Sequence, residues 1–178
     1  MRRLTHAEIS RHRLDPDRPP EGPRTPVYGL LDGIRSLYNV GAMFRTADGA
    51  LLSRLYLCGL TPHPPRIEIE KTALGATRSV PWEYHRDPLV PLRTLKKNGV
   101  RICVLEHTDA SISYGALLQE DLPLCLVVGN ELTGVSDTVL AEADLAVEIP
   151  MFGVKQSLNA VVAFGIVLYH LLRLHRGK

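Results

Sequence analysis

The stretch VEIPMFGVKQSLNAVVAFGIVLYHLL, residues 147–172, decides the fold. It opens with a short apolar run that ends at Pro150, which is typical of a strand that stops abruptly. Residues 151–156 follow as a loop, in which Gly153 can take backbone angles that other residues avoid. Ser157 is then predicted to be the N-cap of a long apolar helix, because serine is a preferred residue at that position.

The predicted helix is apolar on nearly every side from Leu158 to Leu172. Such a helix is buried, spans a membrane or packs against a partner. A membrane span needs about 20 apolar residues, whereas the apolar run from Ala160 is shorter and is interrupted by His170. We therefore expect burial or a subunit interface, and no membrane segment.

Ser157 and Asn159 are expected at the first turn of this helix. Unpaired N–H groups and the positive end of the helix dipole lie there, and they favour a carboxylate, a phosphate or a developing oxyanion. For these two residues alone, a plain capped core helix is the simpler interpretation.

The composition is that of one globular domain. A chain of 178 residues with 45% hydrophobic residues can form a sizeable core. The formal net charge of +2 is too weak to indicate nucleic-acid binding by itself. Cys58, Cys103 and Cys125 lie in apolar, strand-like runs and fit no metal pattern. We expect buried, reduced thiols in a cytoplasmic protein, since the N-terminal stretch has no apolar segment of a secretory signal.

Residues 1–26 are predicted to form a short N-terminal arm. Its few apolar residues stand among charges of both signs, and four prolines extend its second half: Pro19, Pro20, Pro23 and Pro26. Two interpretations stay open, a solvated tail and an arm whose arginines contact phosphates.

Residues 27–178 are predicted to form one α/β domain. Strands are expected at 27–31, 55–58, 100–105, 124–128 and 147–149, with an edge strand at 80–84 that contains Pro81. Helices are expected after Asn39 as N-cap, over 89–97, near Ser136 and after Ser157. Strands that alternate with helices indicate a mostly parallel sheet with helices on both faces.

Polar side chains follow four of these strands. They are Asn39 with Arg45, Glu106, Asn130 with Glu131, and Ser157 with Asn159. Open α/β sheets bind ligands outside the carboxyl ends of their strands. Each group alone is weak evidence for a site, but four groups at equivalent places predict one shared site. Arg45 is expected to point from the start of its helix into that cleft.

The common nucleotide and metal motifs are missing. The chain has no G-x-G-x-x-G after a strand, no G-x-x-x-x-G-K-[ST] and no G-x-S-x-G, and its seven histidines have no ligand spacing. These observations argue against a standard dinucleotide site, a P-loop and a zinc site, and no metal is expected.

Three stretches together resemble a known family. Residues 39–45, NVGAMFR, are similar to its N-x-G-x-x-x-R motif, and residues 129–134, GNELTG, to its G-x-E-x-x-G motif. Residues 149–159, IPMFGVKQSLN, are similar to I-P-M-x-G-x-x-x-S-L-N. In this order and separation they resemble the SpoU (TrmH-like) RNA 2′-O-ribose methyltransferases of the SPOUT class, over roughly residue 27 to the C-terminus.

The resemblance implies a C-terminal trefoil knot in the parallel α/β sheet, which composition cannot suggest because knots are almost absent from proteins. It implies a homodimer, S-adenosylmethionine as the methyl donor and an RNA substrate, either tRNA or rRNA. The family's cofactor position corresponds here to Leu105, Glu106, Gly129, Ile149, Met151, Ser157 and Leu158.

Family analogy casts Arg45 as the residue that activates the ribose 2′-hydroxyl, with Asn39, Glu131, Ser157 and Asn159 orienting it and the ribose. Methyl transfer to a hydroxyl needs an aligned nucleophile and a stabilised alkoxide. A guanidinium is normally a poor base, so Arg45 is either a base in a special setting or a cation that stabilises the oxyanion.

Two other functions are weighed against this one. A non-catalytic RNA-binding module would not need the whole set of Asn39, Arg45, Glu131, Ser157 and Asn159. A nucleotide-binding enzyme of another kind would be expected to carry the glycine fingerprint that is missing here.

Overall fold

The structure is a computed structural model that describes residues 1–10 and 22–177. Within these residues, seven strands form one parallel sheet in the order β3-β2-β1-β6-β4-β7-β5. The strands are β1 (Thr25–Asp32), β2 (Leu52–Cys58), β3 (Trp82–His85), β4 (Arg101–Leu105), β5 (Ile112–Ser113), β6 (Leu124–Gly129) and β7 (Leu145–Glu148).

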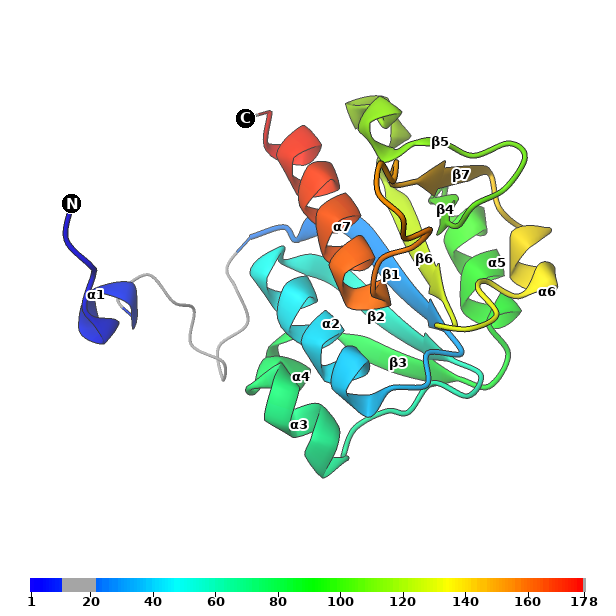
Figure 1. Cartoon of the computed structure of the whole chain (residues 1–178). Helices are drawn as coiled ribbons and strands as arrows, with labels where there is room; N and C mark the ends of the chain where they lie inside the picture. Colours follow the sequence, from blue (N-terminus) through cyan, green and yellow to red (C-terminus); the bar gives the residue numbers. More distant parts are fainter. Residues whose placement is uncertain (11–21, 178) are drawn as a thin grey trace.

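Helices connect most of these strands. They are α1 (His6–Ser10), α2 (Leu37–Gly49), α3 (Ile67–Ala73), α4 (Ala76–Ser79), α5 (Leu89–Lys97), α6 (Asp137–Leu140) and α7 (Ala160–Arg176), with two short 3₁₀ helices, η1 (Tyr114–Ala116) and η2 (Gln119–Asp121). Helices α2 and α7 lie side by side on one face of the sheet, and α5 and α6 cover the other (Figure 1). The prediction of a mostly parallel sheet with helices on both faces is confirmed.

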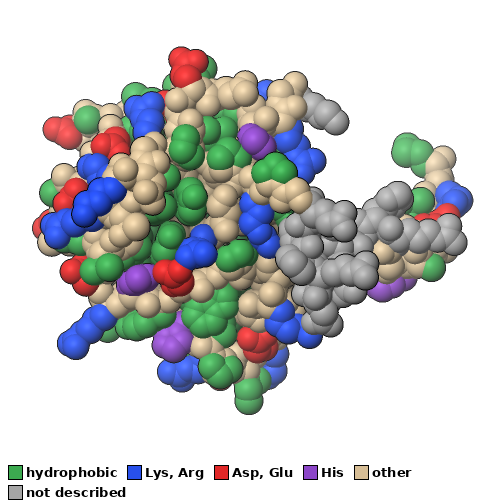
Figure 2. All heavy atoms as spheres, turned by 180° about the vertical axis from the view of Figure 1, so that it is seen from behind, with side chains coloured by type: hydrophobic (Ala, Val, Ile, Leu, Met, Phe, Trp, Pro, Cys, Tyr) green, Lys and Arg blue, Asp and Glu red, His purple; other side chains and the backbone are tan. Residues whose placement is uncertain are grey.

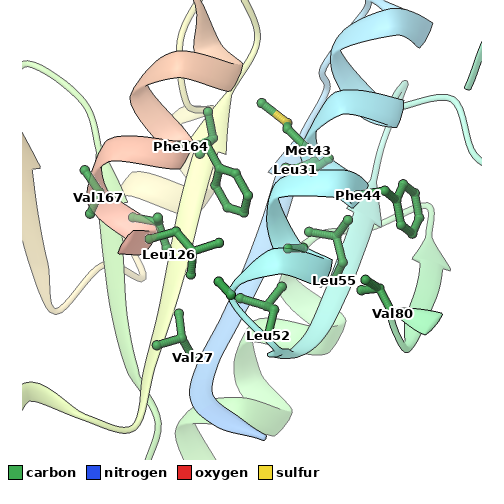
Figure 3. Packing of buried hydrophobic residues seen from close by; sticks show 14 of the residues in the cluster. Val27, Leu31, Met43, Phe44, Leu52, Leu55, Val80, Leu126, Phe164 and Val167 are labelled. Carbon is green, nitrogen blue, oxygen red and sulfur yellow. The ribbon is translucent and has the colours of Figure 1, made fainter. Parts of the chain in front are cut away.

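Each face of the sheet has its own apolar core, because side chains alternate between the faces along a strand. Leu31 packs under α2 and α7, whereas its neighbour Leu30 packs under α5 and α6. Figure 3 shows the first core, in which Phe164 of α7 and Met43 of α2 approach the sheet. All three cysteines are buried and free, as predicted.

Helix α7 is buried on one side only. Phe164, Val167, Leu168 and Leu171 are fully buried, whereas Val162 and Tyr169 are half exposed. The sequence thus correctly predicted burial, and the exposed apolar residues leave the second expectation, a subunit interface, open. No helix in the described part of the chain is long and apolar enough to span a membrane.

Strand β7 enters the sheet between β4 and β5, although both precede it in the sequence. The segment that joins β4 to β5 therefore crosses the carboxyl end of β7. Two hydrogen bonds mark this crossing: Ser111 Oγ donates to Glu148 Oε2 at 2.7 Å, and His107 Nδ1 lies 3.2 Å from the same oxygen.

Two predicted helix caps are wrong. Helix α2 is capped by Ser36, whose Oγ accepts from the Asn39 N–H at 3.3 Å, so Asn39 lies inside the first turn. Helix α7 is capped by Asn159, whose Oδ1 accepts from the Val161 N–H at 2.8 Å. Ser157 therefore lies in the preceding loop, because the residue that satisfies the first free N–H groups is the asparagine.

Other boundaries also differ from the prediction. Strand β2 begins three residues before Leu55, where Leu52 pairs with Thr25 of β1. The polar Ser53, whose Oγ donates to the Thr25 carbonyl, hid this extension from the hydrophobic pattern. Helix α1 was not predicted; the carboxylate of Glu8 accepts from the Thr5 N–H at 2.7 Å and Thr5 Oγ1 accepts from the Glu8 N–H, which together form a capping box. The extended stretch with Pro19 and Pro20 lies outside the described residues.

Candidate active site

A cavity of about 350 Å³ opens at the carboxyl ends of β4, β6 and β7. Its wall contains every residue that the family resemblance assigned to the cofactor: Leu105, Glu106, Gly129, Ile149, Met151, Ser157 and Leu158. Glu131 and Asn159 also line it. Three chain segments far apart in sequence thus meet at the edge of the sheet where ligands bind in open α/β folds.

Glu106 holds the loop after β6 against the end of β4. Its Oε2 accepts from the Val135 N–H at 3.0 Å, and its Oε1 accepts from the His107 N–H at 3.0 Å. Gly134 has φ +72°, and a Cβ at this position would stand 2.3 Å from Glu106 Oε2. Glycine is needed at position 134 for two reasons: its φ is positive, and a side chain would collide with the Glu106 carboxylate.

Gly129 allows the loop after β6 to fold back on the strand. A Cβ at Gly129 would lie 2.2 Å from the backbone of residues 134 and 135. Asn130 and Gly134 exchange both backbone hydrogen bonds across this turn, at 2.9 Å each. The two glycines of the G-x-E-x-x-G motif therefore shape the cavity wall, and they place Glu131 at its rim.

Glu131 fastens the N-terminus of α2 to this loop. Its carboxylate accepts from the N–H groups of Arg35 (2.9 Å) and Ser36 (3.2 Å), and from Asn39 Nδ2 (2.8 Å). Burial alone would raise the pKa of Glu131, but these donors outweigh it and lower the pKa. The carboxylate stays charged at neutral pH, beside the positive end of the helix dipole.

The starts of α2 and α7 meet at the same point. Asn159 Nδ2 lies 3.5 Å from Asn39 Oδ1, and Asn39 in turn donates to Glu131. The chain Asn159–Asn39–Glu131 joins all three motifs at the rim of the cavity. Asn39 is not part of the cavity wall itself.

Arg45 is placed differently from the expectation. It belongs to the middle of α2, not to its start; its side chain is exposed, and it does not line the cavity. It makes no hydrogen bond or ion pair with another described residue, so Asn39 and Glu131 do not orient it within this chain. Residues 38 and 45 are seven apart and share the exposed stripe of α2, on which Tyr38 is 56% exposed.

Two polar residues of the cavity wall were missed by sequence reasoning. His107 and Glu148 line it and link the β4–β5 segment to the end of β7. His107 Nε2 also lies 3.2 Å from the Gln156 carbonyl, in the loop before α7. The only sequence signal was their position beside Glu106 and Ile149, which were both predicted.

The wall of the cavity fits a particular kind of ligand. Leu105, Ile149 and Leu158 offer an apolar surface suited to an aromatic base. Glu106 keeps unused lone pairs that can accept from hydroxyl or ammonium groups, and the neighbouring carboxylates favour a positive charge. Adenosine with a sulfonium-bearing side chain has these features, so the residues present fit S-adenosylmethionine. No group of three or more potential metal ligands occurs among the described residues.

Fold and cavity together define a parallel α/β domain with a ligand site at the carboxyl edge of its sheet and a strand threaded between two earlier strands. Residues 26–169 match the model of the SpoU rRNA methylase family. The chain belongs to this family, which confirms the resemblance carried by the three motifs. Membership implies that the threading of β7 between β4 and β5 is part of a trefoil knot.

Named relatives agree with this assignment. The chain is 33% identical to a tRNA (guanosine(18)-2′-O)-methyltransferase of Aquifex aeolicus over 84% of its length, and 31% identical to a 23S rRNA (guanosine(2553)-2′-O)-methyltransferase of Bacillus subtilis over 80%. An AdoMet-bound rRNA methyltransferase from Sinorhizobium meliloti superposes with a TM-score of 0.78 at 29% identity, over 90% of the chain. The chain spans 70%, 56% and 59% of these three proteins, respectively.

Proposed function

We propose that this chain transfers a methyl group from S-adenosylmethionine to a ribose 2′-hydroxyl of tRNA or rRNA. One observation carries the proposal: residues of the second and third motifs line a single cavity, and Asn39 of the first is hydrogen-bonded to its rim. The named relatives modify tRNA and rRNA at this atom. Since RNA is its substrate, we place the enzyme in the cytoplasm.

In this proposal the cavity binds the cofactor through Leu105, Glu106, Gly129, Ile149, Met151, Ser157 and Leu158. The bound cofactor supplies an electrophilic methyl group on a sulfonium. Asn159 and Asn39 lie at the rim, where their amides can hold a ribose hydroxyl in line with that methyl group. Ser157, exposed in the loop, is a further hydroxyl for the ribose.

Arg45 is proposed to activate the hydroxyl or to stabilise the alkoxide that develops on it. Because the side chain lies outside the cavity of its own chain, it needs a second chain or the bound RNA to bring it to a ribose. The two possible roles, base and cation, remain those set out from the sequence.

We further propose a homodimer in which α7 and α2 lie near the interface. Val162 and Tyr169 are about half exposed on one stripe of α7, and Tyr38 is similarly exposed on the neighbouring α2. Apolar stripes on adjacent helices are suited to a subunit interface. Such an interface would place Arg45 beside the partner chain.

Residues 1–26 are proposed to be an arm that precedes the methyltransferase domain of residues 27–178, although its last residues already pack on that domain: Thr25 begins β1, and Arg24 donates to the Leu52 and Ser79 carbonyls. The family match begins at residue 26, next to the start of β1 at Thr25. Helix α1 makes its side-chain hydrogen bonds within the arm, through Arg2, Thr5 and Glu8. An arm whose arginines contact RNA phosphates remains one of its two interpretations.

The test is methyl transfer from labelled cofactor to unmodified tRNA and rRNA, followed by mapping of the product. A 2′-O-methylated ribose lacks the nucleophile for alkaline cleavage, so the linkage on its 3′ side should survive base. A substrate with a single 2′-deoxy sugar at the mapped position should accept no methyl group. Methylation of that deoxy substrate would show that a base, not the ribose, is modified.

A further inference from the structure

A group of exposed aromatic side chains lies at the same edge of the sheet as the cavity, beyond β2 and β3. The loop after β2 carries His63, and the edge strand β3 carries Tyr84. Their ring centroids are 4.6 Å apart, and His63 also stacks near Trp82 at 6.3 Å with an interplanar angle of 26°. Tyr84 is 40% exposed and Leu60, in the same loop, is 85% exposed.

The structure holds this loop in place firmly. Tyr84 Oη donates to the Gly59 carbonyl at 2.9 Å. The buried Thr61 donates to the Leu31 carbonyl at 2.9 Å and accepts from the Ile34 N–H at 3.0 Å. Trp82 Nε1 donates to the Thr77 carbonyl. The rings are therefore a preorganised surface, which lowers the entropy cost of binding a flat ligand.

Two exposed arginines are close in sequence to the rings. Arg86 follows Tyr84 by two residues, Arg66 follows His63 by three, and both are exposed. The nearest carboxylate on β3, Glu83, is already paired with Arg54 and His85. On the face seen in Figure 2, the histidine side chains in the lower half of the molecule lie among hydrophobic, basic and acidic side chains.

The rings lie within reach of an RNA strand that enters the cavity. In the sheet, β3 is separated from β6 by β2 and β1. Three strand spacings amount to about 14 Å, a distance that a few nucleotides can span. Proteins bind single-stranded nucleic acid through exposed aromatic rings with cations nearby, because bases stack on the rings and phosphates pair with the cations.

We propose that His63, Tyr84 and Leu60 form a stacking site for an unpaired base of the substrate RNA, a few nucleotides from the target ribose, with Arg66 and Arg86 at the flanking phosphates. The inference rests on the proposed function, since it assigns part of the RNA surface of that enzyme. Stacking is tolerant of sequence, so the site selects an unpaired base without specifying which one.

The test compares two fluorescent probes, a short oligoadenylate and the same sugar–phosphate strand without bases. Tyr84→Ala and His63→Ala should weaken oligoadenylate binding about 5- to 150-fold, the loss expected for one base stack, and leave the abasic strand unchanged. Arg86→Ala should weaken both probes and reduce the dependence of log Kd on log salt by about 0.7. Tyr84→Phe keeps the ring and should bind like the wild type.

A matched control is Val90→Ala, another half-exposed residue, on α5. It should change neither probe, and circular dichroism should show that every variant is folded. Equal loss on both probes for Tyr84→Ala, or no loss on either, overturns the inference. So does a wild-type protein that binds neither probe.

Methyl transfer separates this inference from the proposed function. If Tyr84→Ala raises KM for RNA and leaves the cofactor affinity unchanged, both stand. If the wild type methylates RNA and Tyr84→Ala has the same KM, only the stacking site is wrong. If the wild type transfers no methyl group to any RNA, the proposed function fails, whatever the probes show.

Discussion

Asn39 Nδ2 donates to Glu131 Oε1 at 2.8 Å, across 92 residues of sequence. The same carboxylate accepts from the backbone of Arg35 and Ser36. Two motifs that are separate in sequence are thus one structural unit: the second motif supplies an acceptor for the N-terminus of the helix that carries the first. Glu131 consequently has a role in the fold of the site, besides any role towards the ribose.

This bond predicts a pH-dependent stability. Replacing Glu131 with glutamine should lower the free energy of unfolding by about 1 kcal/mol at neutral pH, because charge-assisted bonds to N–H donors are lost. The pKa of Glu131 is lowered in the fold. Its stabilisation is therefore complete above the unfolded-state pKa and is lost as pH falls through the folded-state pKa. Urea unfolding at several pH values measures this.

The difference between wild type and Glu131→Gln should therefore shrink at acid pH. Glu120→Gln is the control, since Glu120 is exposed in η2 and makes no hydrogen bond with another described residue. A difference for Glu131→Gln that is the same at all pH values would contradict the electrostatic explanation.

The sheet could be predicted from the sequence because its strands are short apolar runs. β4 and β6 lie in the middle of the sheet and are buried on both faces, so their hydrophobic pattern is unambiguous. β5 escaped prediction because it has two exposed residues and exists only by pairing with β7. Pairing that depends on a distant segment leaves no local signal.

The site could be predicted in part. The motif residues are close in space because they follow parallel strands, and that rule is visible in a sequence. Helix caps were misplaced because Ser36 and Asn39, or Ser157 and Asn159, are all good capping residues. Only the backbone geometry decides between such pairs. The orientation of Arg45 was not predictable for the same reason, since it depends on which residue starts α2.

Arg45 should be essential for turnover and dispensable for the cofactor. Arg45→Ala is expected to abolish methyl transfer and leave cofactor affinity nearly unchanged, because the side chain is exposed and does not line the cavity. Arg45→Lys should not restore activity, since a forked planar donor and a point charge are not equivalent. Calorimetry with the demethylated cofactor and a methyl-transfer assay measure the two effects. An equal collapse of cofactor binding would mean that the residue has been misplaced.

Gly134 should tolerate no side chain. Gly134→Ala forces a Cβ onto a backbone with φ +72° and towards Glu106 Oε2, which should cost about 1–3 kcal/mol of stability. Displacing Glu106 should also weaken cofactor binding. Gly115→Ala is the matched control, because its Cβ would meet only Ser113 Oγ at 3.7 Å. Thermal unfolding measures the stability of both variants, and calorimetry measures their cofactor affinity. Equal values for Gly134→Ala and Gly115→Ala would contradict the predicted collision with Glu106.

The exposed stripe of α7 should hold a dimer together. Tyr169→Arg is expected to give a monomer by light scattering at micromolar concentration, because a charge at an apolar interface is costly to bury. The control is Ile67→Arg, an equally apolar and more exposed position on α3. A wild-type protein that is monomeric at this concentration would refute the proposed assembly.

The link between His107 and Glu148 should hold the loop before α7 in place. His107 Nδ1 faces Glu148 Oε2, and Nε2 faces the Gln156 carbonyl, both at 3.2 Å. Both partners are oxygen acceptors, so the imidazole ties the end of β7 to the loop before α7 through its ring nitrogens. The hydrogen bond from Ser111, followed by that from His107, lowers the pKa of Glu148, so the carboxylate remains an acceptor until the pH falls through that lowered value.

His107→Phe keeps a ring and removes both bonds. We expect faster amide hydrogen exchange in residues 149–158 and weaker cofactor binding, because that loop forms one wall of the cavity. Asp109→Ala, in the same β4–β5 segment and exposed, should change neither measurement. If wild type and His107→Phe show equal exchange rates in residues 149–158, these two contacts do not hold the loop in place.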